Sequence, residues 1–420
     1  MMQSTPRANR PHIAVFGRRN VGKSSLINAL TNQELALVSE VAGTTADPVY
    51  KSMELLPLGP VVMIDTAGID DTGKLGELRV KKTMEIIRKT DLALVLLNAG
   101  QEIGEFEVEI MDKIKENNTP ILLVLNKEDL LEEKRENEEF VNSVKEKYSA
   151  DLVSVSALKN TGIDKLRRVI AEKVPTDCEK PFIIGDLIRP GETVVLVTPI
   201  DKAAPKGRLI LPQVQTIRDV LDHDGINIVV KERELKLALR NLKTKPRLVA
   251  TDSQAFMKVD ADVPEDILMT SFSILFARYK GELELFFDGA LKLERLQEGE
   301  KILIAEACTH RRQADDIGTV KIPRWLRQKV GKGLSFTHVS GREYPEDLKD
   351  YDLILHCGGC MLNRKEVISR LYEARKAGIP VINYGMAIAA LHGILERALK
   401  PFPYIHEKWL ELSEKAKTNK

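Results

Sequence analysis

Short apolar runs alternate with amphipathic stretches over residues 12–170. The apolar runs predict strands, and apolar residues at helical spacing predict helices between them. Strands that alternate with helices favour a parallel sheet with right-handed crossovers. The segment 174–181 has two prolines and no periodicity, which is typical of a linker. The predicted strands are 12–16, 61–64, 92–97, 121–125 and 152–155, and the helices between them include 24–30, 77–88 and 105–115.

Two further regions follow the linker. The region 182–263 predicts two strands and a helix but no cluster of titratable residues, so we interpret it as a structural or assembly domain. The region 264–420 returns to strands and helices and predicts a second small α/β domain, with a polar and mobile tail after Pro401. The predicted elements are strands 193–197, 247–251, 301–305, 335–339, 353–355 and 381–383, and helices 214–221, 267–279, 324–330, 364–377 and 387–399.

Composition and charge narrow the function. Lys and Arg number 63 against 62 Asp and Glu, which gives a net charge of +1 and does not indicate a strongly basic nucleic-acid binder. Aromatic residues at 5% disfavour base stacking as the main activity. No apolar run reaches the roughly 18 residues of a membrane span, and the first residues lack the apolar stretch of a signal peptide. We therefore expect a cytoplasmic protein.

One segment has the spacing of a phosphate-binding loop. Residues 17–24 fit G-x-x-x-x-G-K-S, follow the predicted strand 12–16 and open a helical stretch, which is the required context. Backbone N–H groups of such a loop and the helix N-terminus bind phosphate oxygens. We expect Lys23 to reach the β- and γ-phosphates and Ser24 to hold Mg²⁺. The nucleotide-binding residues here are Gly17, Arg18, Arg19, Asn20, Val21, Gly22, Lys23, Ser24 and Ser25.

Three more motifs follow in chain order. Residues 65–68 (Asp-Thr-Ala-Gly) end a strand and suit contacts to Mg²⁺ and the γ-phosphate. In residues 126–129 (Asn-Lys-Glu-Asp), the Asp129 carboxylate can accept two N–H bonds from guanine, whereas adenine offers no such pair. Residues 156–158 (Ser-Ala-Leu) would close over the base with a backbone N–H. These motifs predict a GTP site and add Asp65, Gly68, Asn126, Lys127, Asp129, Ser156, Ala157 and Leu158 to the nucleotide-binding residues.

With these motifs, residues 12–170 resemble a small GTPase-type domain. In that family a threonine of the first switch loop completes the Mg²⁺ shell. Residues 43–47 (Gly-Thr-Thr-Ala-Asp) resemble the Gly-Thr-Thr-Arg-Asp of tRNA-modification and ribosome-assembly GTPases, with Ala46 in place of the arginine. The resemblance makes Thr45 the candidate Mg²⁺ ligand beside Ser24, with Thr44 behind it.

Two residues bear on the rate of hydrolysis. Ile69 stands where signalling GTPases carry a water-positioning glutamine, so intrinsic hydrolysis should be slow. The resemblance implies that Asn20 helps coordinate K⁺ beside the phosphates, where the cation would stabilise negative charge as an arginine finger does elsewhere. The resemblance therefore implies a K⁺-stimulated GTP hydrolase whose catalytic residues are Lys23, Asn20, Thr45 and Gly68.

Cysteines and histidines gather behind two predicted strands of the last region. Cys308 and His310 follow strand 301–305, and residues 356–360 (His-Cys-Gly-Gly-Cys) follow strand 353–355. Open α/β sheets place their ligands at the carboxyl ends of strands. Three interpretations are open: buried thiols that bind nothing, a structural zinc site, which the ligand types favour slightly, and an iron–sulfur cluster with one labile corner. Cys178 stands alone in the linker and is given no role.

GTPase motifs, a middle domain, Cys-x-His and a distant His-Cys-x-x-Cys occur in this order over essentially the whole chain, which resembles the FeFe-hydrogenase maturation GTPases (HydF family). The resemblance implies that Cys308, Cys357 and Cys360 bind a 4Fe-4S cluster whose fourth iron has an exchangeable ligand. His310 and His356 match the histidines of the motif and are candidates for that ligand or for a contact around it. Glu306 is a further candidate with less support.

The resemblance also implies a role. The protein would be a scaffold or carrier that receives a precursor of the diiron subcluster from radical-SAM hydrogenase maturases and delivers it to apo FeFe-hydrogenase. It implies an α/β chain of three domains: a P-loop GTPase domain with a parallel sheet and flanking helices at 1–174, an α/β dimerisation domain at 182–263 and an α/β cluster-binding domain at 264–420. A homodimer is expected, with neither membrane nor nucleic acid as a partner.

The alternative is a tRNA-modification or ribosome-assembly GTPase with a structural zinc site. Its N-terminal motifs would be nearly the same. It predicts a basic RNA-binding module downstream, and the sequence shows no such module.

Overall fold

The computed structural model describes residues 6–31, 48–66, 76–99, 103–130, 150–174, 182–200, 209–307, 316–341, 344–345 and 347–418, with residues 76–80 described by their backbone alone. The chain divides into two compact units, Met1–Glu179 and Lys180–Lys420. Several residues singled out above lie outside the described part: Thr44, Thr45, Gly68, Ile69, Cys178, Cys308 and His310.

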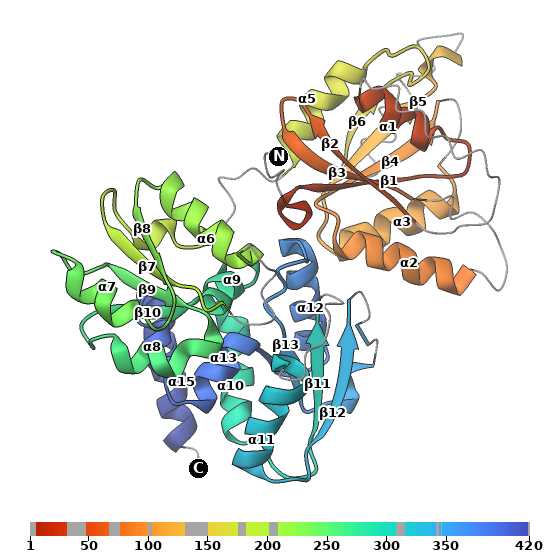
Figure 1. The fold of residues 1–420 in the computed structure, drawn as a ribbon. Coiled ribbons are helices and arrows are strands. Elements are labelled where there is room, and N and C mark those ends of the chain that lie inside the picture. The colour runs from red at the N-terminus through yellow and green to blue at the C-terminus, as the bar shows by residue number, and fades with distance from the viewer. Residues whose placement is uncertain are drawn as a thin grey trace. The chain divides into compact units, whose positions relative to one another are not determined.

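A six-stranded sheet in the order β2-β3-β1-β4-β5-β6 forms the centre of the first unit (Figure 1). Only β2 runs antiparallel to its neighbour, and the other pairs are parallel. The strands are β1 His12–Phe16, β2 Val49–Leu55, β3 Gly59–Asp65, β4 Leu92–Asn98, β5 Ile121–Asn126 and β6 Asp151–Ser154. The helices are α1 Lys23–Thr31, α2 Gly76–Arg88, α3 Glu105–Glu116 and α5 Ile163–Lys173, with 3-10 turns η1 Arg7–Asn9 and η2 Glu128–Leu130.

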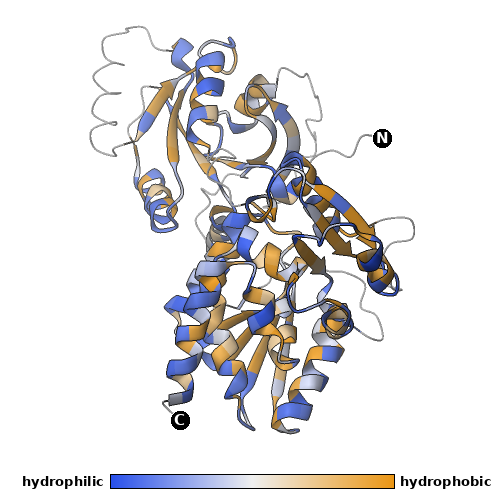
Figure 2. Cartoon of the chain, turned by 90° about the vertical axis from the view of Figure 1, so that its left-hand side faces the viewer, coloured by the Kyte–Doolittle hydropathy of each residue, from blue (hydrophilic) through white to orange (hydrophobic). Residues whose placement is uncertain are grey.

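Helices cover both faces of this sheet, which explains the continuous apolar runs of its strands. Successive side chains of β1 point to opposite faces: Ile13 and Val15 join a core with α1 and α5, whereas Ala14 and Phe16 join a core with α2 and α3. Figure 2 shows apolar strands between helices whose outward faces are hydrophilic. The predicted α/β fold with a parallel sheet and flanking helices is confirmed. Strand β2 was missed because it is an edge strand in which only Leu55 is fully buried, so it has little apolar pattern.

Two four-stranded parallel sheets build the second unit, in the orders β10-β9-β7-β8 and β12-β11-β13-β14. The strands are β7 Thr193–Val197, β8 Ile226–Val230, β9 Leu248–Thr251, β10 Leu268–Ser271, β11 Lys301–Glu306, β12 Ser335–Ser340, β13 Leu353–His356 and β14 Val381–Asn383. The α-helices are α6 Leu211–Asp222, α7 Leu235–Asn241, α8 Phe256–Asp262, α9 Phe272–Lys280, α10 Phe287–Glu294, α11 Ile322–Val330, α12 Arg364–Lys376, α13 Tyr384–Leu391, α14 Leu395–Leu399 and α15 Pro403–Thr418. The remaining turns are η4 Gly185–Leu187, η5 Ser253–Ala255, η6 Leu283–Phe286, the π-helical η7 Ile317–Lys321 and η8 Leu348–Asp350.

One continuous hydrophobic core joins the two sheets of the second unit. Helix α9 lies at the junction, because it contacts α6 beside the first sheet and both α12 and α13 beside the second. The segment after Pro401 was expected to be a polar, mobile tail, and this prediction is wrong. It forms helix α15, which buries Trp409 against Phe287 with ring centroids 5.4 Å apart.

The stretch 267–279 was predicted as one helix, but the structure divides it into strand β10 and helix α9. A short apolar run fits either element, and pairing with β9 decides for a strand. Strand β10 belongs to the sheet of the middle region although it lies beyond residue 263, where we expected that domain to end. Among the described residues, no helix is both long and apolar enough to cross a membrane.

Candidate functional site

The loop between β1 and α1 has the backbone of a phosphate cradle. Gly17, Asn20 and Gly22 have φ of 147°, 62° and 96°, a region in which glycine is favoured. A Cβ on Gly22 would lie 2.4 Å from Asn126 Nδ2. Gly22 therefore lets the guanine motif approach the phosphate loop.

Two side chains at the start of α1 already have partners. Lys23 Nζ donates to the main-chain oxygens of Gly17 at 2.7 Å and Arg18 at 2.8 Å. The Ser24 hydroxyl donates to Asp65 Oδ2 at 2.7 Å. An alcohol and a carboxylate side by side form an oxygen donor set that Mg²⁺ prefers. The chemistry of Ser24 and Asp65 therefore fits the Mg²⁺ of a bound nucleotide.

The guanine motifs join the same edge of the sheet. Asn126 Nδ2 donates to Val21 O at 2.9 Å, and its Oδ1 accepts the Ala157 N–H at 3.1 Å. Lys127 Nζ donates to Asn20 O at 2.8 Å. Asparagine and lysine of one motif thus tie the phosphate loop to the loop that follows β6. Leu158 is 84% exposed beside them.

The carboxylate expected to recognise guanine is held by a hydroxyl. Ser156 Oγ donates to Asp129 Oδ1 at 2.5 Å. This hydrogen bond, with smaller contributions from Lys159 and Lys127, lowers the pKa of Asp129 below its usual value. Asp129 is therefore a carboxylate at neutral pH, as two N–H donors of guanine require.

One ion pair at this site was not predicted. Arg18 of the phosphate loop donates to both oxygens of Glu107, through Nη2 at 2.9 Å and Nε at 2.7 Å. Glu107 also accepts the Gly104 N–H at 3.0 Å, at the start of α3. The spacing of Gly104 and Glu107 resembles a helix-capping signal, but it does not point to a partner 89 positions away.

Cys357 lies at the switch point of the second four-stranded sheet. Strands β11 and β13 are neighbours with Ala305 opposite His356, and the outer strands lie on either side of them. Ligand sites of open parallel sheets lie outside the carboxyl ends of such a central pair. Cys357 Sγ accepts the N–H of Ala307 at 3.0 Å and of Gly359 at 3.4 Å. The sulfur thus joins the ends of both strands.

The segment 357–362, which we call the cysteine loop, contains both described cysteines. Both carry thiols. Gly359 has φ of 59°, and a Cβ there would lie 3.1 Å from Val367 Cγ2. Glycine therefore permits the tight turn that separates Cys357 from Cys360. Thiols at this spacing are typical ligands of zinc and iron–sulfur clusters.

A buried lysine supports the cysteine loop from outside it. Lys280 at the end of α9 is 1% exposed, and Nζ donates to the main-chain oxygens of Gly359 at 3.0 Å, Cys360 at 3.0 Å and Leu362 at 2.6 Å. Burial lowers the pKa of Lys280 to about 8, while the nearby Cys360 and Cys357 oppose the shift. Sequence reasoning missed this residue.

His356 is buried at the end of β13. Its Nδ1 lies 2.6 Å from the main-chain oxygen of Cys357, and its Nε2 has no hydrogen-bond partner among the described residues. Burial, aided by Arg370, lowers the pKa of His356 to about 4. The imidazole is therefore neutral at pH 7, with Nδ1 as the donor and a lone pair on Nε2, as a metal ligand requires.

Glu306, at the end of β11, is also buried. Tyr384 donates its hydroxyl to Glu306 Oε1 at 3.4 Å. Within the described ranges, no three His, Cys, Asp or Glu side chains are grouped to hold a metal ion. Cys308 and His310, which the sequence adds to this set, lie outside those ranges. The thiols and the neutral imidazole that are described fit a soft metal or an iron–sulfur cluster.

Comparison with known families defines the class first. Residues 12–127 match the family model of the 50S ribosome-binding GTPase, so the first unit is a GTPase domain. Residues 183–281 match the hydrogen maturase F dimerization domain, and residues 284–401 match the hydrogen maturase F tetramerization domain. Together these two models cover more than half of the chain. The chain belongs to the hydrogen maturase F family.

Curated relatives resemble the chain over part of its length. The tRNA modification GTPase MnmE of Aquifex aeolicus (strain VF5) is 38% identical over 179 residues, which are 42% of this chain and 37% of that protein. GTPase Era of Thermoanaerobacter sp. (strain X514) is 31% identical over 229 residues, 51% of this chain and 73% of that protein. GTPase Der of Mycoplasmopsis agalactiae (strain NCTC 10123 / CIP 59.7 / PG2) is 33% identical over 194 residues, 43% of this chain and 44% of that protein. The chain thus spans less than half of the MnmE and Der relatives.

Proposed function

We propose that this protein hydrolyses GTP in its first unit and holds a 4Fe-4S cluster on Cys308, Cys357 and Cys360 in its second. It acts in the cytoplasm as a scaffold that receives the precursor of the diiron subcluster from radical-SAM maturases and delivers it to apo FeFe-hydrogenase. Membership of the hydrogen maturase F family supports the role. The observation that carries the cluster is the hydrogen bond from Ala307 N–H to Cys357 Sγ.

This hydrogen bond bears on the distance between the cysteines. Cys308 follows Ala307 directly, and Cα atoms across a trans peptide are about 3.8 Å apart. Ala307, the residue before Cys308, therefore lies at the sulfur of Cys357, although Ala307 and Cys357 are 50 positions apart in the sequence. Three thiolates from these two segments would hold three irons and leave the fourth with an exchangeable ligand, where a cyanide nitrogen of the cargo could bind. His356 and His310 are the candidate residues for that position.

The contacts of the phosphate loop support GTP hydrolysis. Backbone N–H groups of residues 17–24 and Lys23 would bind the phosphates, and Ser24 with Asp65 and Thr45 would hold Mg²⁺. Asp129 selects guanine, and the Gly68 N–H contacts the γ-phosphate.

Asn20 gives the hydrolysis a cation dependence. In our proposal its side chain helps bind K⁺ next to the phosphates, where the cation stabilises developing negative charge. Phosphate release in KCl should exceed that in NaCl, and Asn20→Ala should remove the difference. Equal turnover of the wild type in the two salts would contradict the K⁺ site.

The cluster is tested by anaerobic purification with iron and sulfide quantification and EPR. The wild type should contain about four irons and an equal amount of sulfide per chain. Cys308→Ala and Cys357→Ala should lose most of both, whereas Cys178→Ala, a cysteine outside the motifs, should match the wild type. Zinc without sulfide in the wild type would support the alternative of a structural zinc site and overturn the scaffold.

The GTPase is proposed as a switch for the scaffold. The γ-phosphate orders switch loops, and hydrolysis releases them. The affinity of the homodimer for each radical-SAM maturase and for apo-hydrogenase should therefore differ between GTP, GDP and no nucleotide. The same affinity in all three states would exclude the switch.

A further inference from the structure

The three hydrogen bonds of Lys280 define its charge. Its Nζ donates to three main-chain oxygens of the cysteine loop at 2.6–3.0 Å, and the side chain is 1% exposed. A neutral amine has two N–H bonds, and an ammonium has three. Three carbonyl acceptors therefore require the ammonium. Lys280 is therefore an ammonium whose three N–H donors are all taken by the loop.

The end of α9 that carries Lys280 is held from the other side as well. Arg364, at the start of α12, donates Nη1 to the main-chain oxygens of Tyr279 and Gly281, each at 3.0 Å. Lys280 thus binds the loop before α12, and Arg364 binds the residues on either side of Lys280. This reciprocal arrangement joins the last residues of the dimerization match, 183–281, to the cysteine loop.

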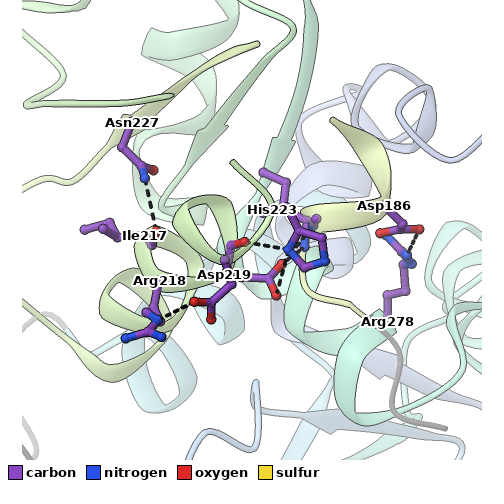
Figure 3. Close-up of polar contacts among 10 residues, drawn as sticks. Asp186, Ile217, Arg218, Asp219, His223, Asn227 and Arg278 are labelled. Atoms are coloured by element: carbon purple, nitrogen blue, oxygen red, sulfur yellow. Dashed lines mark hydrogen bonds and ion pairs between the residues drawn. The ribbon is translucent and has the colours of Figure 1, made fainter. Parts of the chain in front are cut away.

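A second contact fixes α9 one half-turn earlier. Arg278 forms an ion pair with Asp186 (Figure 3). Asp186 follows Ile184 and Gly185, whose N–H groups both donate to Asp219 Oδ2 at 2.8 Å. The helix is therefore tied through η4 to α6, which lies beside the first sheet of its unit, while Lys280 contacts the loop of the second sheet.

We propose that Lys280 is the positioning residue of the cluster site, which holds the cysteine loop in its ligating shape and supplies a positive charge beside its thiolates. The inference rests on the proposed cluster. The main-chain carbonyls of residues 359, 360 and 362 all accept hydrogen bonds from the ammonium. These bonds hold the backbone of the loop in a turn and thereby position Cys357 and Cys360. A buried charge acts strongly because the protein interior screens it less than water.

The charge has a measurable consequence. Reduction adds an electron to a cluster that already carries the negative charge of its thiolates, and a nearby ammonium stabilises the reduced form more than the oxidised form. Net charge around the cluster sets the reduction potential. Removal of the ammonium should therefore make the potential more negative, whereas a lysine that only filled space would leave it unchanged.

The test uses full-length protein reconstituted anaerobically and a redox titration followed by EPR. At a fixed potential near the midpoint, Lys280→Met should lower the ratio of reduced to oxidised cluster about tenfold, which is about 59 mV for one electron. Lys280→Arg, which keeps the charge, should stay closer to the wild type than Lys280→Met. Lys292→Met is the matched control, because Lys292 on α10 pairs with Glu300, and it should match the wild type. A wild-type potential in Lys280→Met would overturn the inference.

A second readout needs no cluster. In the cluster-free protein, amide hydrogen exchange of residues 357–362 should be at least tenfold faster in Lys280→Met than in wild type or Lys292→Met. If the wild type binds no iron, the proposed function fails, and exchange still decides whether Lys280 orders the loop: unchanged exchange overturns it. If Lys280→Met does not fold, Lys280→Gln takes its place with the same expectations. Turnover of GTP should be unaltered in each variant.

Discussion

Two lysines hold two loops by the same chemistry, but the sequence places them very differently. Lys23 donates to two main-chain oxygens of the phosphate loop, between β1 and α1. Lys280 donates to three main-chain oxygens of the cysteine loop, between β13 and α12. Both loops leave the carboxyl end of a parallel strand, each contains at least one glycine at positive φ, and both precede a helix.

The two lysines differ in their sequence separation from their acceptors and in their availability to a ligand. Lys23 is five and six positions from its acceptors, and Lys280 is 79 to 82 positions from its own. Lys23 donates to carbonyls of its own loop, where we expect the phosphate oxygens of GTP to bind. Lys280 has no donor left for a ligand. The first lysine therefore belongs to a site that exchanges its contents, and the second to a site that keeps its shape.

Removal of Lys23 should produce the largest effect. Lys23→Ala takes a positive charge from the phosphates, and loss of one such group costs about 10²–10³ in turnover. Phosphate release at saturating GTP measures this, and the iron content should remain that of the wild type. Lys173→Ala, on a helix of the same unit, is the control because Lys173 forms an ion pair with the exposed Asp151. Turnover within tenfold of the wild type would show that Lys23, like Lys280, supports its loop and does not act on the phosphates.

Local spacing explains how much of the phosphate site could be predicted. Strand, glycine loop and helix follow one another within twenty residues, so the motif itself states which side chains meet. The structure brings Ser24 to Asp65 and Asn126 to Ala157, although the roles of these residues stay predictions. Lys280 could not be found this way, because the sequence does not show whether a lysine at the end of a helix is exposed or buried, and its acceptors are 79 to 82 positions away.

The secondary structure likewise divides into elements that the local apolar pattern predicts and elements that it does not. Strands β1, β7 and β14 were predicted to the residue because their apolar runs are buried on both faces. Strand β8 was missed because it is an edge strand with exposed Ile226 and Val229. Helix α15 was missed because its segment is polar overall, although Ile405, Trp409 and Leu412 recur at helical spacing and pack against the core.

Substitution of Asp129 tests whether the nucleotide site recognises guanine. Asp129→Asn replaces one acceptor oxygen with a donor, and loss of a hydrogen bond to a charged group costs about 1.5–3 kcal/mol, or roughly 10–100-fold in GTP affinity. Xanthine has an oxygen where guanine has its amine, so the variant should gain affinity for xanthosine triphosphate. Titration with both nucleotides measures this, with Asp164→Asn as the surface control. A parallel loss for both would contradict base recognition.

His12 tests the strand that supports the phosphate loop. Burial lowers the pKa of His12 to about 4, against an opposing hydrogen bond to the main-chain oxygen of Arg10. Between pH 6.5 and 4 the unfolded chain binds the proton and the folded chain does not, so stability falls as the pH falls. From pH 7 to pH 5 the loss is about 2 kcal/mol.

Urea unfolding of the first unit, followed by pulsed hydrogen exchange of β1 peptides, measures this loss. His12→Gln should have a smaller difference between pH 7 and pH 5 than the wild type, since glutamine does not titrate. The same difference in both proteins would assign the pH dependence to another group. The phosphate loop would then rest on a strand that is insensitive to mild acid.

The ion pair between Arg18 and Glu107 should give the smallest effect. It tests whether the phosphate loop, like the cysteine loop, is supported by a side chain of a distant helix. Like Lys280, Glu107 reaches its loop from a distant helix, and it binds Arg18 through both carboxylate oxygens. Because Arg18 is half exposed, the pair should contribute only about 1 kcal/mol, so Glu107→Gln should weaken GTP binding about fivefold. Fluorescent-nucleotide titration measures this against Glu105→Gln, an exposed glutamate on the same helix. If the two variants bind GTP equally well, Glu107 does not shape the phosphate loop, and the remote partners of that loop are Asn126 and Lys127.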